Sequence, residues 1–223
     1  MYISLVDNEN PEKMRILLRE SAFICEYVVR DIGKKIQWKC SRLNFNCVSN
    51  GEIREKIFNF SGCLEMDVPF NDCYYDMNVS EKTHYICEIL QSGLKKYCGQ
   101  KNIDYSLITN SFERLRSADY LVEFYTTKPC HHGNYTAKLR CIQDIHTAHF
   151  YVDLYHQRRL VEKIPFFKTE PDRLSWFFKV CTLDWKTDYT IVLLSHPYMD
   201  GHRDEKVLNV QKWINKGQFA QLQ

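Results

Sequence analysis

The chain has 223 residues and a formal net charge of +2, and 44% of its residues are hydrophobic. Its eight glycines and six prolines exclude collagen-like and Pro-rich chains, and the near-neutral charge gives no overall field toward nucleic acid or membranes. We therefore expect one α+β domain over residues 1–223 with a continuous core. The alternative is a sub-layer at 1–68 beside a main part at 69–223.

The cysteines and the first residues bear on the cellular compartment. None of the ten cysteines forms the CxxC or CxC pairs that zinc ribbons and thioredoxin-like centres use. The N-terminus has neither a basic segment nor a long apolar segment of a secretory signal, and no apolar run is long enough to span a membrane. We expect a cytoplasmic protein with free thiols and without a metal or cofactor.

The first third of the chain predicts a strand, a long helix and a hairpin. Residues 2–6 are the strand, and Asn10 with Pro11 begins a helix whose apolar residues recur at helical spacing until Gly33. Alternation follows over 36–47, and Asn50-Gly51 is typical of a hairpin turn that leads into a strand over 53–60. The segment 61–79 is predicted to be irregular and to mark the boundary between two parts of the chain, if the chain is divided.

The remainder predicts more helices and an antiparallel meander. Ser80 caps a helix that ends at Gly99, and Asp104 caps a third helix. Thr169 opens a fourth helix in the style of a capping box, and a last strand runs over 189–195. Between them lie four successive strands, at 120–127, 135–142, 148–155 and 160–167. The predicted fold class is α+β, with a largely antiparallel sheet and about four helices packed on it.

Three arrangements of residues are candidates for catalysis. Asp172 followed by Asp184 and Lys186 fits the loose pattern of a PD-(D/E)xK nuclease, in which carboxylates bind Mg²⁺ and a lysine stabilises charge at the phosphate. The second is a histidine group, and the third is Cys130 as a nucleophile beside the first two of these histidines. The histidines are His131, His132, His146, His149 and His156. A metal-dependent nuclease or hydrolase is therefore the alternative function.

Two segments are candidates for a protein-binding surface. Alternation along 148–155 places Tyr151, Asp153 and Tyr155 on the face opposite the apolar one, and aromatic residues with an acid are favoured at protein interfaces. The loop near residue 74 is a second aromatic and acidic patch, composed of Asp72, Tyr74, Tyr75 and Asp76. Basic pairs such as Arg158-Arg159 are interleaved with acids, which indicates a solvated surface and no direct contact with nucleic acid.

Residues 80–200 combine a helix that has the internal segment Ile89-Leu90-Gln91-Ser92-Gly93-Leu94 with a second helix and an antiparallel meander. A strand that ends in Ile164-Pro165-Phe166-Phe167 then runs into Thr169-Glu170-Pro171-Asp172, an aromatic-rich helix and an apolar strand. This order of elements resembles bacterial immunity proteins of polymorphic-toxin and contact-dependent growth inhibition systems.

The resemblance implies a cytoplasmic protein without catalysis whose partner is a cognate toxin domain. Many such toxins are nucleases, although the near-neutral charge of this chain leaves the class of toxin open. For a nuclease partner, we expect outward carboxylates to mimic phosphates and to occlude its active site. The candidates for this role are Asp72, Asp76 and Asp153.

Overall fold

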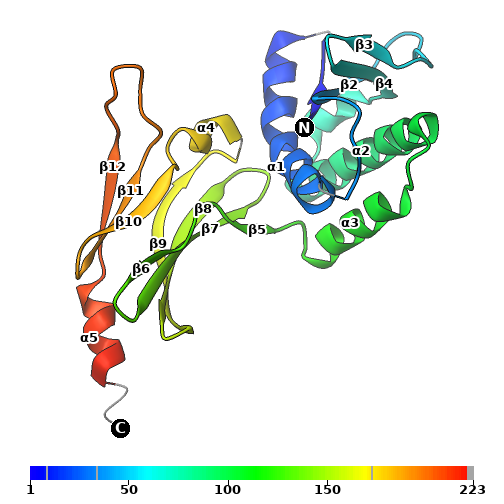
Figure 1. The fold of residues 1–223 in the computed structure, drawn as a ribbon. Helices are drawn as coiled ribbons and strands as arrows, with labels where there is room; N and C mark the ends of the chain where they lie inside the picture. Colours follow the sequence, from blue (N-terminus) through cyan, green and yellow to red (C-terminus); the bar gives the residue numbers. More distant parts are fainter. Residues whose placement is uncertain (9, 34, 172, 220–223) are drawn as a thin grey trace. The chain divides into compact units, whose positions relative to one another are not determined.

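The computed structural model describes residues 1–8, 10–33, 35–171 and 173–219. The chain divides into two compact units, which Figure 1 shows as ribbons. Unit 1 comprises Met1–Val122 with Asp144–His146, and unit 2 comprises Glu123–Gln143 with Thr147–Gln223. The predicted α+β class is confirmed, because helices and strands each account for about a third of the chain. No helix in the described part of the chain is long and apolar enough to cross a membrane.

Unit 1 contains a four-stranded mixed sheet in the order β1-β2-β4-β3. Three strands are parallel, and only β3 is antiparallel to its neighbour β4. The strands are β1 (Tyr2–Val6), β2 (Arg42–Val48), β3 (Phe58–Phe60) and β4 (Cys63–Pro69). The helices are α1 (Pro11–Ile32), the short 3₁₀ helix η1 (Asp72–Asp76), α2 (Val79–Lys101) and α3 (Ser106–Ser117).

Helices pack on the apolar face of this sheet. Leu5, Phe45 and Met66 are fully buried at matching positions of β1, β2 and β4. A Cβ atom at Gly93 of α2 would lie 2.5 Å from the Phe45 ring, so α2 approaches the sheet closely only because this residue is glycine. Helix α1 begins as predicted, with the Asn10 side chain accepting hydrogen bonds from the first turn.

The predicted hairpin at Asn50-Gly51 is wrong. Strand β2 has β1 on one side and β4 on the other, both parallel to it, so no edge is left for a strand over 53–60. The actual hairpin joins β3 to β4 through Ser61 and Gly62, which both have positive φ. The segment 61–79 therefore contains an interior strand, and the predicted boundary near residue 68 falls inside unit 1.

Unit 2 contains two antiparallel sheets, so the expectation of a largely antiparallel fold holds for this unit and not for unit 1. A five-stranded sheet has the order β5-β7-β8-β9, with β6 paired to β7, and a three-stranded sheet has the order β10-β11-β12. The strands of the first sheet are β5 (Val122–Tyr125), β6 (Cys130–His132), β7 (Tyr135–Gln143), β8 (Ala148–His156) and β9 (Arg159–Thr169). The remaining elements are α4 (Arg173–Phe177), β10 (Thr182–Thr187), β11 (Thr190–Leu194), β12 (Glu205–Asn209) and α5 (Gln211–Phe219).

One face of the five-stranded sheet belongs to the core of unit 2. Leu139, Phe150 and Val152 are buried there, and the Trp176 ring of α4 packs against Phe150. The opposite face, which we call the outer face, carries the polar residues of the same strands. The sequence did not predict β6, β10, β12 or α5.

Candidate protein-binding site

Strand register brings one set of polar and aromatic residues together on the outer face. In the antiparallel ladder, Arg140 of β7 lies opposite Tyr151 of β8, and Lys138 lies opposite Asp153. Side chains at directly opposed positions share a face of the sheet. The alternating burial of β5 places the exposed Tyr125 on the same side. We call Tyr125, Lys138, Arg140, Tyr151, Asp153 and Tyr155 the tyrosine cluster.

A buried ion pair lies at the centre of the tyrosine cluster. Arg140 Nε is 2.9 Å from Asp153 Oδ2 and 3.1 Å from Oδ1, and the two residues are 4% and 2% exposed. Arg140 Nη1 also contacts Glu123 Oε2 at 3.2 Å. Burying a charge is costly unless it is paired and hydrogen-bonded, and both conditions are met here. The pair therefore fixes the positions of β7 and β8 side chains at the middle of the outer face.

Tyrosine rings surround the ion pair and hydrogen-bond to it. The Tyr125 hydroxyl donates to Asp153 Oδ2 at 3.2 Å and lies 3.2 Å from the Tyr155 hydroxyl. The hydrogen bond with Tyr155 raises the pKa of the Tyr125 phenol above its ordinary value, and burial raises it further. Lys138 Nζ lies 4.7 Å from the centre of the Tyr155 ring and 5.4 Å from that of Tyr125.

This arrangement is a rigid aromatic surface whose polar groups are already paired. The Arg140 guanidinium lies 5.2 Å from the centre of the Tyr151 ring, so each of the three rings has a cation over it. Tyrosines that are held in place lose little conformational entropy on binding, and such residues supply much of the energy of protein interfaces. Chemically, the tyrosine cluster is suited to bind another protein.

The structure corrects one of the predicted residues at this site. Tyr151 and Tyr155 are half-buried on the outer face, where alternation predicted them. Asp153 shares that face, but the prediction that its carboxylate points into solvent is wrong, because Arg140 and Tyr125 enclose it. Sequence reasoning missed Tyr125, Lys138 and Arg140. Alternation along 135–142 placed Lys138 and Arg140 on one face of a strand. Their position beside Asp153 depends on the register between β7 and β8, which alternation does not give.

The second predicted patch belongs to unit 1, and most of its side chains are engaged internally. Tyr74 is fully buried and donates a hydrogen bond to Glu20 at 2.6 Å, so the prediction that it contacts a partner is wrong. Tyr75 is partly buried and donates to Asp7 at 2.7 Å. The two acids of the patch, Asp72 and Asp76, are exposed, and Asp72 is 2.9 Å from Lys13 and 2.8 Å from Ser49.

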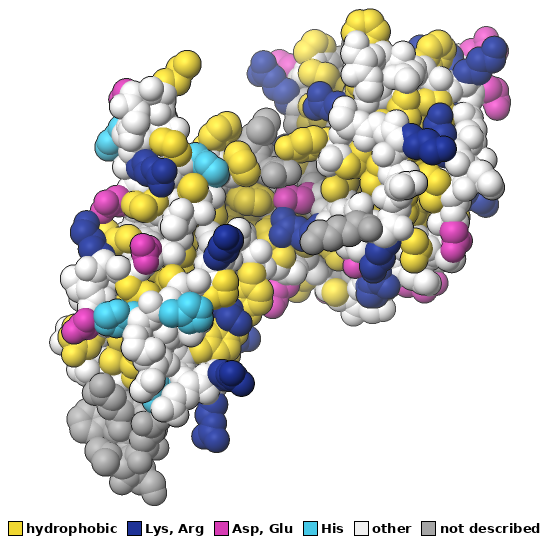
Figure 2. All heavy atoms as spheres, viewed as in Figure 1, with side chains coloured by type: hydrophobic (Ala, Val, Ile, Leu, Met, Phe, Trp, Pro, Cys, Tyr) yellow, Lys and Arg dark blue, Asp and Glu magenta, His cyan; other side chains and the backbone are white. Residues whose placement is uncertain are grey.

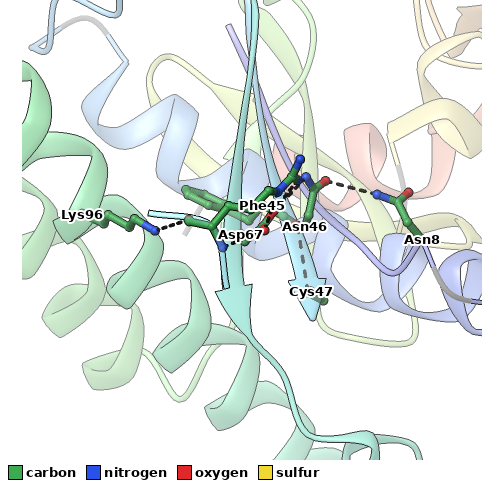
Figure 3. A network of polar contacts seen from close by, with 7 residues as sticks. Asn8, Phe45, Asn46, Cys47, Asp67 and Lys96 are labelled. Carbon is green, nitrogen blue, oxygen red and sulfur yellow. Dashed lines mark hydrogen bonds and ion pairs between the residues drawn. The ribbon is translucent and has the colours of Figure 1, made fainter. Parts of the chain in front are cut away.

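Unit 1 also contains a polar network that no sequence motif indicated, shown in Figure 3. Asp67 at the end of β4 accepts two hydrogen bonds of 2.6 Å from the Arg54 guanidinium and one of 3.3 Å from Asn46. The Arg54 hydrogen bonds lower the pKa of the Asp67 carboxyl to about 2. Lys96 of α2 donates to the Arg54 carbonyl oxygen at 3.0 Å. The network anchors the segment between β2 and β3 to the sheet and to α2.

The residues proposed for catalysis are dispersed or otherwise engaged. Asp184 is exposed, Lys186 Nζ is 2.9 Å from Glu205, and Asp172 lies outside the described residues. His131 contacts Thr136 and His132 contacts Asp188, each at 2.9 Å. Across the described ranges, no group of three or more His, Cys, Asp or Glu side chains is arranged to bind a metal ion.

The cysteine expected to be most reactive is buried. Cys130 is 8% exposed, and burial raises the pKa of its thiol to about 11. A thiol with so high a pKa carries almost no thiolate at neutral pH, and the thiolate is the nucleophile. Cys130 belongs to strand β6 and not to a loop, and its thiol lies 3.7 Å from the Ala137 carbonyl oxygen of the neighbouring strand.

Comparison of the chain with protein-family models, with curated proteins and with solved structures finds no match. The tyrosine cluster therefore stands on its own geometry. In it, three tyrosine side chains that are partly open to solvent are held in place by hydrogen bonds and by cations over their rings.

Proposed function

We propose that this chain is a cytoplasmic immunity protein that binds a cognate toxin domain and neutralises it without catalysis. The observation that carries the proposal is the tyrosine cluster, in which three tyrosines surround the Arg140–Asp153 ion pair on the outer face of the sheet. An immunity protein acts by occupying its toxin, and this requires a preorganised surface in place of reactive groups. The resemblance of residues 80–200 to such proteins points in the same direction.

The mode of neutralisation differs from phosphate mimicry. Of the three acids considered for that role, Asp153 is buried in an ion pair and Asp72 is paired with Lys13. The third of these acids, Asp76, is exposed, and no ion pair of its side chain is found among the described residues. We therefore propose that the aromatic centre of the outer face, and not a row of carboxylates, makes the main contact with the toxin.

The proposal predicts that a secreted protein with a C-terminal toxin domain is encoded next to this chain, and that domain is the partner to use in the test. We expect the full chain to bind that domain and to abolish its toxicity. Replacing Tyr125, which is 46% exposed, with alanine should weaken binding by about 2 kcal/mol, or roughly thirtyfold, because it removes an aromatic anchor.

Tyr198→Ala is the matched control. Tyr198 is 52% exposed and donates to Asp204 at 2.7 Å, so it resembles Tyr125 in exposure and in bonding to a carboxylate, but it lies on the connection between β11 and β12. We expect this variant to bind like the unmodified chain. Absence of binding by the unmodified chain, or equal losses in both variants, contradicts the proposal.

A further inference from the structure

The outer face carries more exposed cations than exposed acids. Lys163 lies opposite Asp153 and Lys168 opposite His149 in the β8–β9 ladder, so both share the outer face with the tyrosine cluster. Both lysines are exposed. Asp153 is buried against Arg140, and Glu123, whose side chain is 56% exposed, lies 3.2 Å from the same guanidinium. The charges of Lys138, Lys163 and Lys168 therefore dominate the field above the face.

The turn between β8 and β9 extends this charge. Arg158 and Arg159 are exposed there, and Figure 2 shows Lys and Arg side chains following one another over unit 2 toward this turn. Gln157 and Arg158 have φ of 47° and 71°, the backbone conformation for which Asn and Gly are preferred in a two-residue hairpin turn. Keeping a long side chain there costs about 1 kcal/mol per residue, and such strain is found at functional positions.

We propose that the toxin surface bound by the outer face is acidic, and that a basic strip surrounding the tyrosine cluster recognises it. The basic strip consists of Lys138, Lys163 and Lys168 on the outer face and Arg158 in the adjoining turn, whereas Arg159 lies opposite His156 and belongs to the other face. The inference rests on the proposed function, because it names the chemistry of the partner's surface. Exposed charges of one sign around an aromatic centre speed association and select partners of opposite charge.

The contacts favour an acidic protein over a nucleic acid. Single-stranded nucleic acids stack their bases on aromatic rings that are free to receive them. Here Lys138 already lies over the Tyr125 and Tyr155 rings, and Arg140 lies over Tyr151. The Tyr125 hydroxyl is bonded to Asp153 as well, so the rings are held in place for lateral contact with protein side chains.

The test reverses three charges of the basic strip in the full chain. Lys138→Glu, Lys163→Glu and Lys168→Glu are combined in one variant. The control variant combines Lys39→Glu, Lys56→Glu and Lys128→Glu, which are exposed residues and give the same change in net charge. A milder variant with Lys163→Gln and Lys168→Gln covers the case in which the triple reversal disturbs folding, which circular dichroism reports.

Binding is measured for the toxin domain, for a labelled peptide of about ten glutamates and for a labelled single-stranded oligothymidylate of similar charge, at about 20 mM and about 150 mM salt. We expect the reversed variant to bind the toxin domain and the peptide at least about tenfold more weakly than the control variant, with the largest difference at low salt. The milder variant should show a smaller loss in the same direction.

Two results overturn the inference. One is equal affinity of the reversed and control variants for the toxin domain, in which case the proposed function stands and the acidic surface does not. The other is tight binding of oligothymidylate that Tyr125→Leu abolishes, which assigns the face to nucleic acid. If the toxin domain fails to bind the unmodified chain while the peptide binds through the basic strip, the proposed function is wrong and the acid-binding surface remains.

Discussion

Removing Arg140 is the sharpest test of the physical account of the outer face. Arg140→Leu keeps much of the apolar stem and deletes the guanidinium that lies 2.9 Å from Asp153. The Asp153 carboxylate, which is 2% exposed, then stays buried with one hydrogen bond, from Tyr125 at 3.2 Å. Breaking a buried ion pair from one side is therefore more damaging than losing the pair itself.

The magnitude follows from what remains around the carboxylate. Breaking a buried pair costs about 3–5 kcal/mol in proteins. Because the Tyr125 hydrogen bond persists and the outer face borders solvent, we expect the lower end, a loss of about 3 kcal/mol in the free energy of unfolding. Adding Asp153→Leu removes the stranded charge, so the double variant should regain at least about 2 kcal/mol.

Urea unfolding followed by tryptophan fluorescence measures these changes. Trp176, Trp185 and Trp213 lie in unit 2 and Trp38 in unit 1, so the signal is weighted toward the unit that carries the ion pair. A loss below about 1 kcal/mol for Arg140→Leu would refute the reasoning, since that is the range of a solvent-exposed pair. A double variant no more stable than Arg140→Leu would also refute it.

Two further predictions concern unit 1. Gly93→Ala should destabilise the protein by about 1–3 kcal/mol in urea unfolding, because its Cβ would lie 2.5 Å from the Phe45 ring, whereas Gly99→Ala, with open space around it, should be neutral or stabilising. The Asp67 pKa of about 2 is below the unfolded value of about 3.9, so its contribution of up to about 2 kcal/mol is present above pH 4 and is lost as the pH falls through 2. Asp67→Asn should remove this part of the acid dependence, and an unchanged profile would contradict it.

Local signals in the sequence predicted the elements that depend on local contacts. Asn10, Pro11 and the helical spacing after them located α1, and alternation located β8 with its apolar and polar faces. The strand over 2–6 is confirmed as β1. In each case the period of apolar residues reflects one buried face, which the sequence records directly.

Long-range pairing is where the prediction failed. Asn50-Gly51 has the composition of a hairpin turn, but parallel neighbours on both sides of β2 decided the fold, and no short motif records them. The other half of the tyrosine cluster, Tyr125, Lys138 and Arg140, was missed for the same reason. Arg140 and Asp153 are 13 residues apart, and their contact depends on the β7–β8 register.

The most direct test of the account is covalent labelling of tyrosines in the complex with the toxin domain, read by mass spectrometry. Tyr198, on the β11–β12 connection, is the internal reference, and the free chain gives the starting reactivity. The account predicts that binding protects Tyr125 and Tyr155 and leaves Tyr198 unchanged. Unchanged labelling of Tyr125 and Tyr155 in a fully formed complex would show that the outer face of unit 2 is not where the partner binds.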